Sequence, residues 1–196
     1  MTFTDLCNEV YAITNRPDLV AETKSAVKAA TLKCHHFDFF YKDLLEVPLQ
    51  WQIKKFLQEF EYRTQIPRYR ALKYIRHFDV RSDSPGDFFE ILDPTVVLDS
   101  YGVHRDNAAY VAGELVKLRC SREFDYVLFG CYVHPSILEG SYSSWVALEY
   151  PYAIIYEAAA SVFKMVGFDE QSAAMRAEAA NLLIELRNSN ILAQGE

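Results

Sequence analysis

Apolar residues near the N-terminus recur at helical spacing and predict a short helix that begins at Thr2. Thr2 and Asp5 match a capping box, in which a threonine is followed three residues later by an acidic side chain. The apolar stripe consists of Phe3, Leu6, Val10 and Ile13. A second helix is predicted over 17–36, because Pro17 suits the first position of a helix. Its predicted buried face consists of Leu19, Thr23, Ala26, Val27, Ala30 and Cys34.

The pattern changes between Phe37 and Val133 to aromatic and β-branched runs that are separated by turn residues. Residues 116–120 alternate apolar and charged side chains, which is the period-two pattern of a half-buried strand. The turn at 121–125 leads to 126–133, which we predict to be the hairpin partner of that strand. Further predictions are strands at 70–78, at 108–112 and within 51–62, the last of which also fits a helix, and a short helix from Asp93 to about Asp99.

Helical spacing returns in the last third of the chain. Pro151 begins a predicted helix with the stripe Ile154, Ile155, Ala158, Val162 and Met165. Gly167 is expected to close this helix in the left-handed conformation. Asp169 begins an alanine-rich helix to about Asn190, marked by Ala173, Ala177, Ala180, Ile184 and Arg187. The order predicts an α+β fold: helices at about 2–36 and 151–190 pack as a bundle, with a β-rich extension over about 44–133, in one compact unit of residues 1–196.

Composition agrees with a folded chain. Of the 196 residues, 51% are hydrophobic, which is enough to build a core. No apolar run approaches the ~20 residues that span a bilayer, so no membrane partner is expected. Asp5 and Glu9 stand where an export signal would be basic and then apolar, so we expect synthesis in the cytoplasm. The four cysteines form no CxxC pair and are predicted to be buried, reduced thiols.

Charge is distributed unevenly along the chain. The net charge of -7 argues against a general nucleic-acid binder. Residues 63–81 nevertheless contain six Lys and Arg against one Asp, and residues 82–114 contain seven Asp and Glu against one Arg. The juxtaposition of these blocks makes a head-to-tail contact between copies of the chain plausible.

No catalytic, cofactor or metal motif stands out in the sequence. The closest two of the seven glycines are ten residues apart, which excludes the common phosphate-binding loops and the nucleophile elbow. His35, His36 and Asp38 come nearest to a metal cluster, but adjacent histidines on a helix point about 100° apart. A small hydrolase or metal-dependent enzyme that uses these three residues is kept as an alternative, and we predict no cofactor.

Interface residues are predicted in three places. The first is the basic and aromatic stretch, which would face DNA or an acidic neighbour, or else be a solvated edge strand: Arg63, Arg68, Tyr69, Arg70, Lys73, Tyr74 and Arg76. The second is the pair Tyr142 and Trp145, which we expect in an exposed loop. The third is Ile191 and Leu192, the apolar anchor of a polar tail over 188–196 that is expected either to become ordered on a partner or to be the frayed end of the preceding helix.

The order of several segments resembles the head-to-tail adaptor (connector) proteins of tailed bacteriophages. The segments are NRPDLV at 15–20, AATLK at 29–33, DFFYKDL at 38–44, PRYRALKYIR at 67–76, YPYAI at 150–154 and the helix at 169–190. The resemblance implies a structural virion protein without enzyme activity. It implies a ring, dodecameric in that family, beneath the portal at the head-tail junction.

In such a ring the adaptor extends the DNA channel and offers a platform for tail or nozzle proteins. The resemblance therefore implies four partners, namely the portal protein, tail or nozzle proteins, further copies of the chain and, by non-specific contact, DNA. A monomeric or dimeric adaptor for a host partner is a further alternative.

Overall fold

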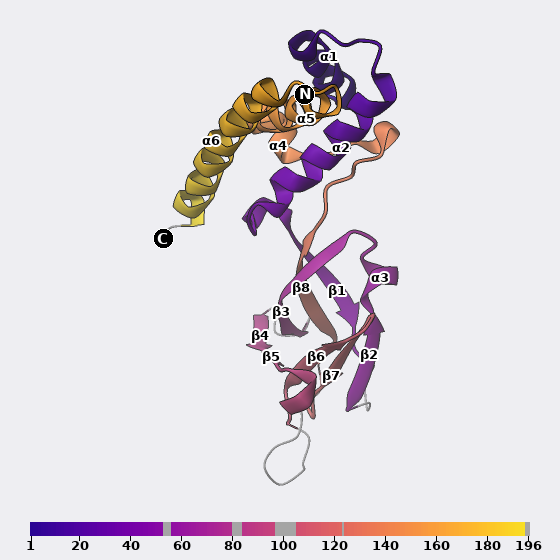
Figure 1. Ribbon diagram of the computed structural model, residues 1–196. Coiled ribbons are helices and arrows are strands. Elements are labelled where there is room, and N and C mark those ends of the chain that lie inside the picture. Colours follow the sequence, from indigo (N-terminus) through magenta and orange to yellow (C-terminus); the bar gives the residue numbers. More distant parts are fainter. Residues whose placement is uncertain (53–55, 80–83, 97–104, 123, 195–196) are drawn as a thin grey trace. The chain divides into compact units, whose positions relative to one another are not determined.

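The computed structural model describes residues 1–52, 56–79, 84–96, 105–122 and 124–194 (Figure 1). Helices near both ends and strands in the middle make the chain α+β, which confirms the predicted fold class. Contacts within the chain group it into two compact units, where the sequence alone favours one. The helical unit comprises residues 1–43 and 134–196, and the β unit comprises residues 44–133.

The helical unit begins as the sequence predicts. The Thr2 hydroxyl accepts a hydrogen bond from the Asp5 N–H, and the Asp5 carboxylate accepts one from the Thr2 N–H, so the capping box is present. The elements of the unit are α1 (Phe3–Thr14), α2 (Val20–His36), η1 (Tyr41–Asp43), η3 (Glu139–Ser141), α4 (Trp145–Glu149), α5 (Pro151–Met165) and α6 (Asp169–Gln194). Within the part of the chain that the structure describes, none of the helices has the length and apolar content needed to cross a bilayer.

The start of α2 differs from the prediction. The helix begins at Val20, three residues after Pro17. A turn occupies the preceding positions, because the Leu19 N–H bonds to the Arg16 carbonyl and the Arg16 guanidinium pairs with Asp18. The predicted buried face is correct from Thr23 onward.

The helix α5 is the centre of the helical unit. It packs against α1, α2, α4 and α6, and nine of its fifteen residues are buried. Small side chains such as Ala158 and Ala159 let the neighbouring helices approach closely. Pro151 begins the helix and Gly167 follows it with a φ of 84°, both as predicted. Met165 was predicted on the buried stripe but is exposed at the end of the helix.

The helix α6 buries a different face from the one that the alanine spacing marks. The marked residues Ala173, Ala177, Ala180, Ile184 and Arg187 are all exposed. The buried face consists of Ser172, Ala179, Leu183, Leu186 and Asn190. Most residues of the exposed set come directly after a residue of the buried set, as Ile184 comes after Leu183. One position along a helix corresponds to a rotation of about 100°, so the two sets lie on different sides of the helix. Therefore α6 has one face packed in the unit and a second, apolar face exposed.

The β unit contains two four-stranded sheets. The first has the order β1 (Leu44–Gln50), β8 (Tyr126–Val133), β3 (Tyr69–Asp79), β4 (Ser84–Phe88). The second has the order β2 (Leu57–Glu61), β7 (Leu115–Arg119), β6 (Ala108–Ala112), β5 (Glu90–Ile91). All neighbouring strands are antiparallel except β5 and β6. Two short helices, α3 (Tyr62–Gln65) and η2 (Pro94–Val96), complete the unit.

Most predicted strands are found close to their predicted bounds. The ambiguous stretch 51–62 contains the strand β2, while 53–55 lies outside the described residues. The short helix at Asp93 is found as η2, and its predicted end near Asp99 also lies outside them.

The predicted hairpin between 116–120 and 126–133 is wrong. The strand β7 lies between β2 and β6, whereas β8 lies between β1 and β3 in the other sheet. The partner of β7 is β6, which it meets across a two-residue turn at Gly113, whose φ is 63°. The chain passes from one sheet to the other between β7 and β8. This connection is held in place by the buried Phe124 side chain and by a hydrogen bond from the Trp51 N–H to the Asp125 carbonyl.

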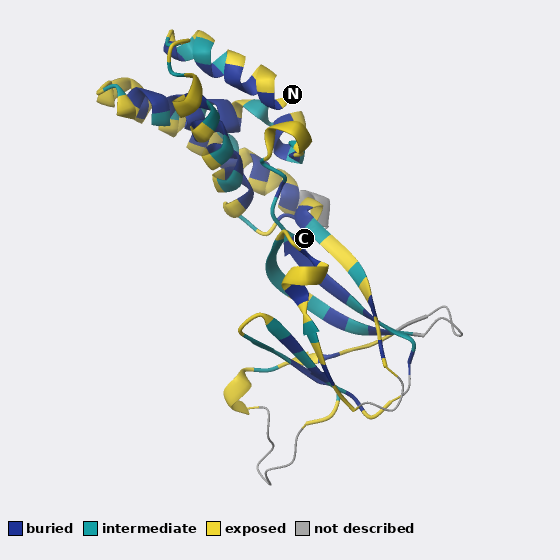
Figure 2. Ribbon diagram, turned by 90° about the vertical axis from the view of Figure 1, so that its right-hand side faces the viewer, coloured by how far each residue is buried: buried dark blue, intermediate teal, exposed yellow. Residues whose placement is uncertain are grey.

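Side chains from both sheets form the core of the β unit, and Figure 2 shows buried and exposed positions alternating along the strands. Burial alternates over the first half of β8, where Val127 and Phe129 are fully buried and Tyr126 and Leu128 are half-buried, and Cys131 in the second half is fully buried as well. The remaining core consists of Leu49, Trp51, Tyr62, Ile66, Ile75, Phe89, Ala109, Val116, Leu118, Cys120 and Phe124. This core fixes which side chains of β3 face inward, and hence which face outward.

Candidate functional site

The three residues of the enzyme alternative have separate partners. His35 is buried, whereas His36 is exposed and its Nε2 lies 3.1 Å from His134 Nδ1. The Asp38 carboxylate lies 3.3 Å from the Arg187 guanidinium. Over the described residues, no group of three or more His, Cys, Asp or Glu side chains could hold a metal ion. The structure does not unite these residues in one site.

His35 belongs instead to a buried polar network at the end of α2. Its Nδ1 lies 2.8 Å from Asp43 Oδ1, and its Nε2 lies 2.9 Å from the Ser144 hydroxyl. The Trp145 indole N–H donates to the same Asp43 oxygen at 2.7 Å. A carboxylate can only accept hydrogen bonds. The hydrogen bond to Asp43 therefore requires a proton on His35 Nδ1. Sequence reasoning missed this network because its members are far apart in the chain.

The order carboxylate, imidazole, hydroxyl is the one found in serine hydrolases. In this network, however, the Ser144 hydroxyl also accepts a hydrogen bond from the Ala147 N–H, as the N-cap of α4. Asp43, His35 and Ser144 are all buried. A nucleophile must reach its substrate, and a buried capping serine does not. We therefore interpret the network as a structural link between α2, η1 and α4.

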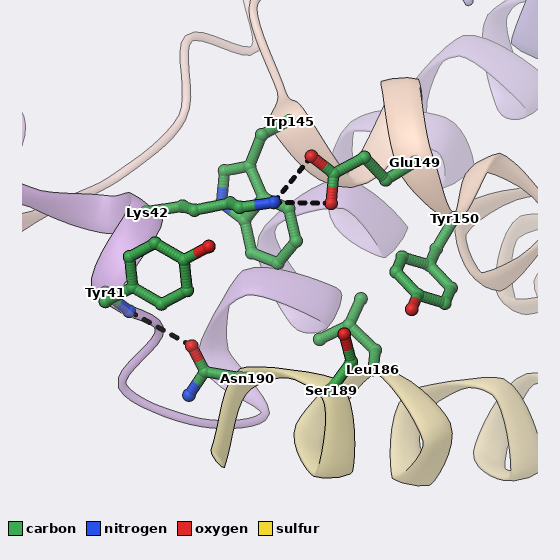
Figure 3. Close-up of a pocket in the computed structure, with 8 residues that line it drawn as sticks. All are labelled: Tyr41, Lys42, Trp145, Glu149, Tyr150, Leu186, Ser189 and Asn190. Carbon is green, nitrogen blue, oxygen red and sulfur yellow. Dashed lines mark hydrogen bonds and ion pairs between the residues drawn. The ribbon is translucent and has the colours of Figure 1, made fainter. Parts of the chain in front are cut away.

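A hollow of about 250 Å³, including space open to solvent, lies beside Trp145 (Figure 3). The Lys42 ammonium lies 2.6 Å from both Glu149 carboxylate oxygens, and 5.2 Å from the Trp145 ring centroid. The Glu149 carboxylate raises the pKa of Lys42. The remaining lining consists of Tyr41, Tyr150, Leu186, Ser189 and Asn190. Since the Lys42 ammonium already has a bidentate carboxylate partner, its charge is engaged within the chain.

Tyr142 and Trp145 are not in an exposed loop, which corrects the sequence prediction. Both are partly buried against the helical core. The Tyr142 hydroxyl lies 2.8 Å from the Thr31 hydroxyl, and burial raises the Tyr142 pKa. Trp145 begins α4 and packs edge-on against Phe40. These two aromatic residues stabilise the unit from within.

The predicted C-terminal tail is helical up to Gln194, which agrees with the helix-end alternative for residues 188–194 and not with an unfolded tail. Buried Asn190 contributes to this order, because its side-chain oxygen accepts a hydrogen bond from the Tyr41 N–H at 3.2 Å. Ile191 is partly exposed at 36%, and the Leu192 side chain lies outside the described residues. The sequence signal for this helix was weak, since Asn188, Ser189 and Asn190 favour caps and turns.

The residues of the predicted basic interface differ in their partners and in their exposure. Arg63 pairs with Glu114 at 3.3 Å, and Arg76 pairs with Glu46 at 2.8 Å. Tyr69 packs on the β core, and Tyr74 donates a hydrogen bond to Glu46 at 3.1 Å. Arg63, Arg68 and Lys73 are exposed, and Arg70 and Arg76 are half-buried.

All four cysteines are buried, as predicted. Burial raises the pKa of Cys34 to about 12 and that of Cys131 to about 11. We expect the native thiols to react with a disulfide reagent at pH 8 at least a hundred times more slowly than the unfolded chain, because about one in ten thousand Cys34 thiols is ionised. A colour-forming disulfide reagent with and without denaturant measures this. A native thiol that reacts as fast as the denatured ones would contradict the burial.

Comparison with known proteins adds no relative to these observations. No protein-family model matches the chain, and no curated protein matches it.

Proposed function

We propose that the chain is a structural virion protein, a head-to-tail adaptor that forms a ring beneath the portal of a tailed bacteriophage. The order of its sequence segments supports the proposal through the resemblance described above. The partners are the portal, tail or nozzle proteins and further copies of the chain, twelve in a complete ring. No membrane partner and no catalytic activity belong to the proposal.

The observation that carries the proposal is the set of large apolar side chains that the helical unit exposes. Leu148 and Leu138 are 74% and 69% exposed. Others are Phe37, Phe39, Tyr152, Met165, Phe168 and Ile184. Large apolar side chains on the surface are available for burial against a partner. These exposed side chains support the proposal that the chain is an assembly component.

The exposed face of α6 supports the same conclusion. Its residues are spaced by four and three in alternation, the spacing with which helices pack side by side. They are Ala173, Ala177, Ala180, Ile184, Arg187 and Ile191, all exposed. With ~1.5 Å per residue the stripe is about 27 Å long. In this proposal Ile191 contacts a partner as part of a helix, not as part of an unfolded tail.

Electron microscopy of the chain mixed with the portal protein of its own phage tests the proposal. We expect rings of the chain on the portals, with twelve copies by native mass spectrometry. Ile184→Asp should weaken assembly by about ten- to a hundredfold, because burial of one such side chain contributes ~1.5–3 kcal/mol. Asn188→Asp adds the same charge to an exposed polar position of α6 and is the control.

Two outcomes would contradict the proposal. One is a portal that stays bare at saturating concentrations of the chain. The other is an Ile184→Asp variant that assembles as well as Asn188→Asp. A stable monomer or dimer that ignores the portal would favour the alternative of an adaptor for a host partner.

A further inference from the structure

We propose that two copies of the free chain bind each other through α6, in an antiparallel contact with two-fold symmetry. The contact surface is the exposed α6 stripe described above, extended at its N-terminal end by the exposed residue Glu170. The inference goes beyond the adaptor proposal and does not depend on it, because a two-fold contact closes with two copies and cannot continue into a ring. In an adaptor, this dimer would be the state before assembly, and it would open when the stripe contacts a neighbour in the ring.

The helix α6 has a free side because it packs chiefly against α5 (Figure 1). At 100° per residue, the stripe lies about 110° around the helix from the buried residues of α6. Ile184 is 52% exposed and Ile191 is 36% exposed. Side chains spaced by three and four in alternation form the contact line of two-helix coiled coils, in which a second helix covers them.

One antiparallel register gives each stripe residue from 170 to 187 a suitable counterpart in a second copy. Its symmetry axis passes between residues 178 and 179, midway between the two members of each layer. At the centre two small side chains face each other, so the helices can approach closely. Farther out a small side chain faces a large one, and at both ends a carboxylate faces a guanidinium. From the centre outward, the layers are Ala177 with Ala180, Ala173 with Ile184, and Glu170 with Arg187.

The outer layers give the contact its charge complementarity. Glu170 is exposed, and the ion pairs among the described residues do not include it. The Arg187 side chain is 57% exposed, and its Nε lies 3.3 Å from the Asp38 carboxylate of the same chain. A guanidinium has five donors, so it can bind a second carboxylate beside the first. Two-fold symmetry repeats the contact of Glu170 with Arg187 at either end of the dimer.

Other arrangements of the same two helices lose these contacts. A parallel pair in register would place Glu170 against Glu170 and Arg187 against Arg187, which is repulsive. Moving the antiparallel register by seven residues places Arg187 against Ala177, or Glu170 against Ala180, and removes both ion pairs. An unrelated partner helix would not require opposite charges at equal distances from the centre of the stripe. The symmetric placement of the charges therefore favours a second copy of the chain as the occupant.

Sedimentation velocity of the full chain, at low salt and at about 5–500 μM, tests the inference. We expect the wild type to be in equilibrium between monomer and dimer. Glu170→Arg and Arg187→Glu each place like charges in both outer layers, so each variant should dimerise about tenfold more weakly or worse. An equimolar mixture of the two variants should recover the dimer, because both outer layers then again join a carboxylate to a guanidinium.

Glu178→Arg is the matched control for Glu170→Arg. It makes the same charge change at an exposed position of α6 that is turned about 140° from Ala173, so it should dimerise like the wild type. Thermal unfolding checks that all three variants are folded. The mixture is a further internal control, because neither loss of helix stability nor loss of the Asp38 contact would be repaired by mixing.

A wild-type chain that stays monomeric over the whole concentration range would overturn the inference. So would a mixture that forms no more dimer than its two components, or a dimer that both charge reversals leave unchanged. Rings on the portal formed by a chain that never dimerises would leave the adaptor proposal standing. A charge-dependent dimer of a chain that ignores the portal would support the α6 contact and count against the adaptor.

Discussion

Asp43→Ala is expected to lower the free energy of unfolding by about 2–5 kcal/mol, because each donor that loses its acceptor inside the protein costs about 1–3 kcal/mol. The Asp43 carboxylate accepts from His35 and from the Trp145 indole, and the network is closed by Ser144. Without the carboxylate, the buried His35 and the partly buried Trp145 indole lose their acceptor. Denaturant unfolding followed by Trp fluorescence and circular dichroism measures the change.

Asp18→Ala is the matched control for this prediction. Asp18 also accepts two hydrogen bonds from a basic side chain, that of Arg16, but its side chain is 59% exposed. Exposed pairs contribute about 0–1 kcal/mol, so this variant should unfold nearly like the wild type. If both variants lost the same small amount, the network would have no special role in stability.

Gly130→Ala is expected to destabilise the β unit by about 1–3 kcal/mol, the range for overpacking a filled site. Its new methyl group would lie 2.5 Å from the Tyr74 ring and displace it from Glu46. The experiment is a double-mutant cycle with Tyr74→Ala, read by denaturant unfolding.

In the Tyr74→Ala background, Gly130→Ala should cost almost nothing, because the atoms that it meets are gone. Gly140→Ala, where no atom lies within 4 Å of the added Cβ, should be neutral in either background. A cost for Gly130→Ala that persists after removal of the Tyr74 ring would show that the ring is not the cause.

Local patterns predicted the helices and most strands, because each depends on side chains a few positions apart. The capping box at Thr2, the break at Gly167 and the alternation in β7 are examples. The pairing of strands does not follow from alternation. The segment after Cys120 looked like a hairpin turn, but it carries the chain to the other sheet. The path of this segment depends on the burial of Phe124 in the core of the β unit, which the local sequence pattern does not reveal.

The candidate sites were predictable only where charge alone defines them. Clustered cations at 63–76 were visible in the sequence, but the partners of Arg76 and Arg63 are Glu46 on β1 and Glu114 in the turn before β7. His35 was identified as a candidate residue, and its partner Ser144 lies 109 positions away. The α6 stripe was visible too. Spacing alone could not tell its exposed face from its buried one, since both repeat with the same period.

The insertion of the β unit into the helical unit affects the order in which the chain can fold. A ribosome completes α1 and α2 first, but their packing partner α5 follows only after the 90 residues from Leu44 to Val133. The β unit contains all its own core residues and can fold while the apolar faces of α1 and α2 still wait for α5. The two ends of the chain must then meet across a long loop, which is slow compared with local contacts. During synthesis, the uncovered faces of α1 and α2 are therefore the part of the nascent chain most exposed to aggregation and most in need of a chaperone.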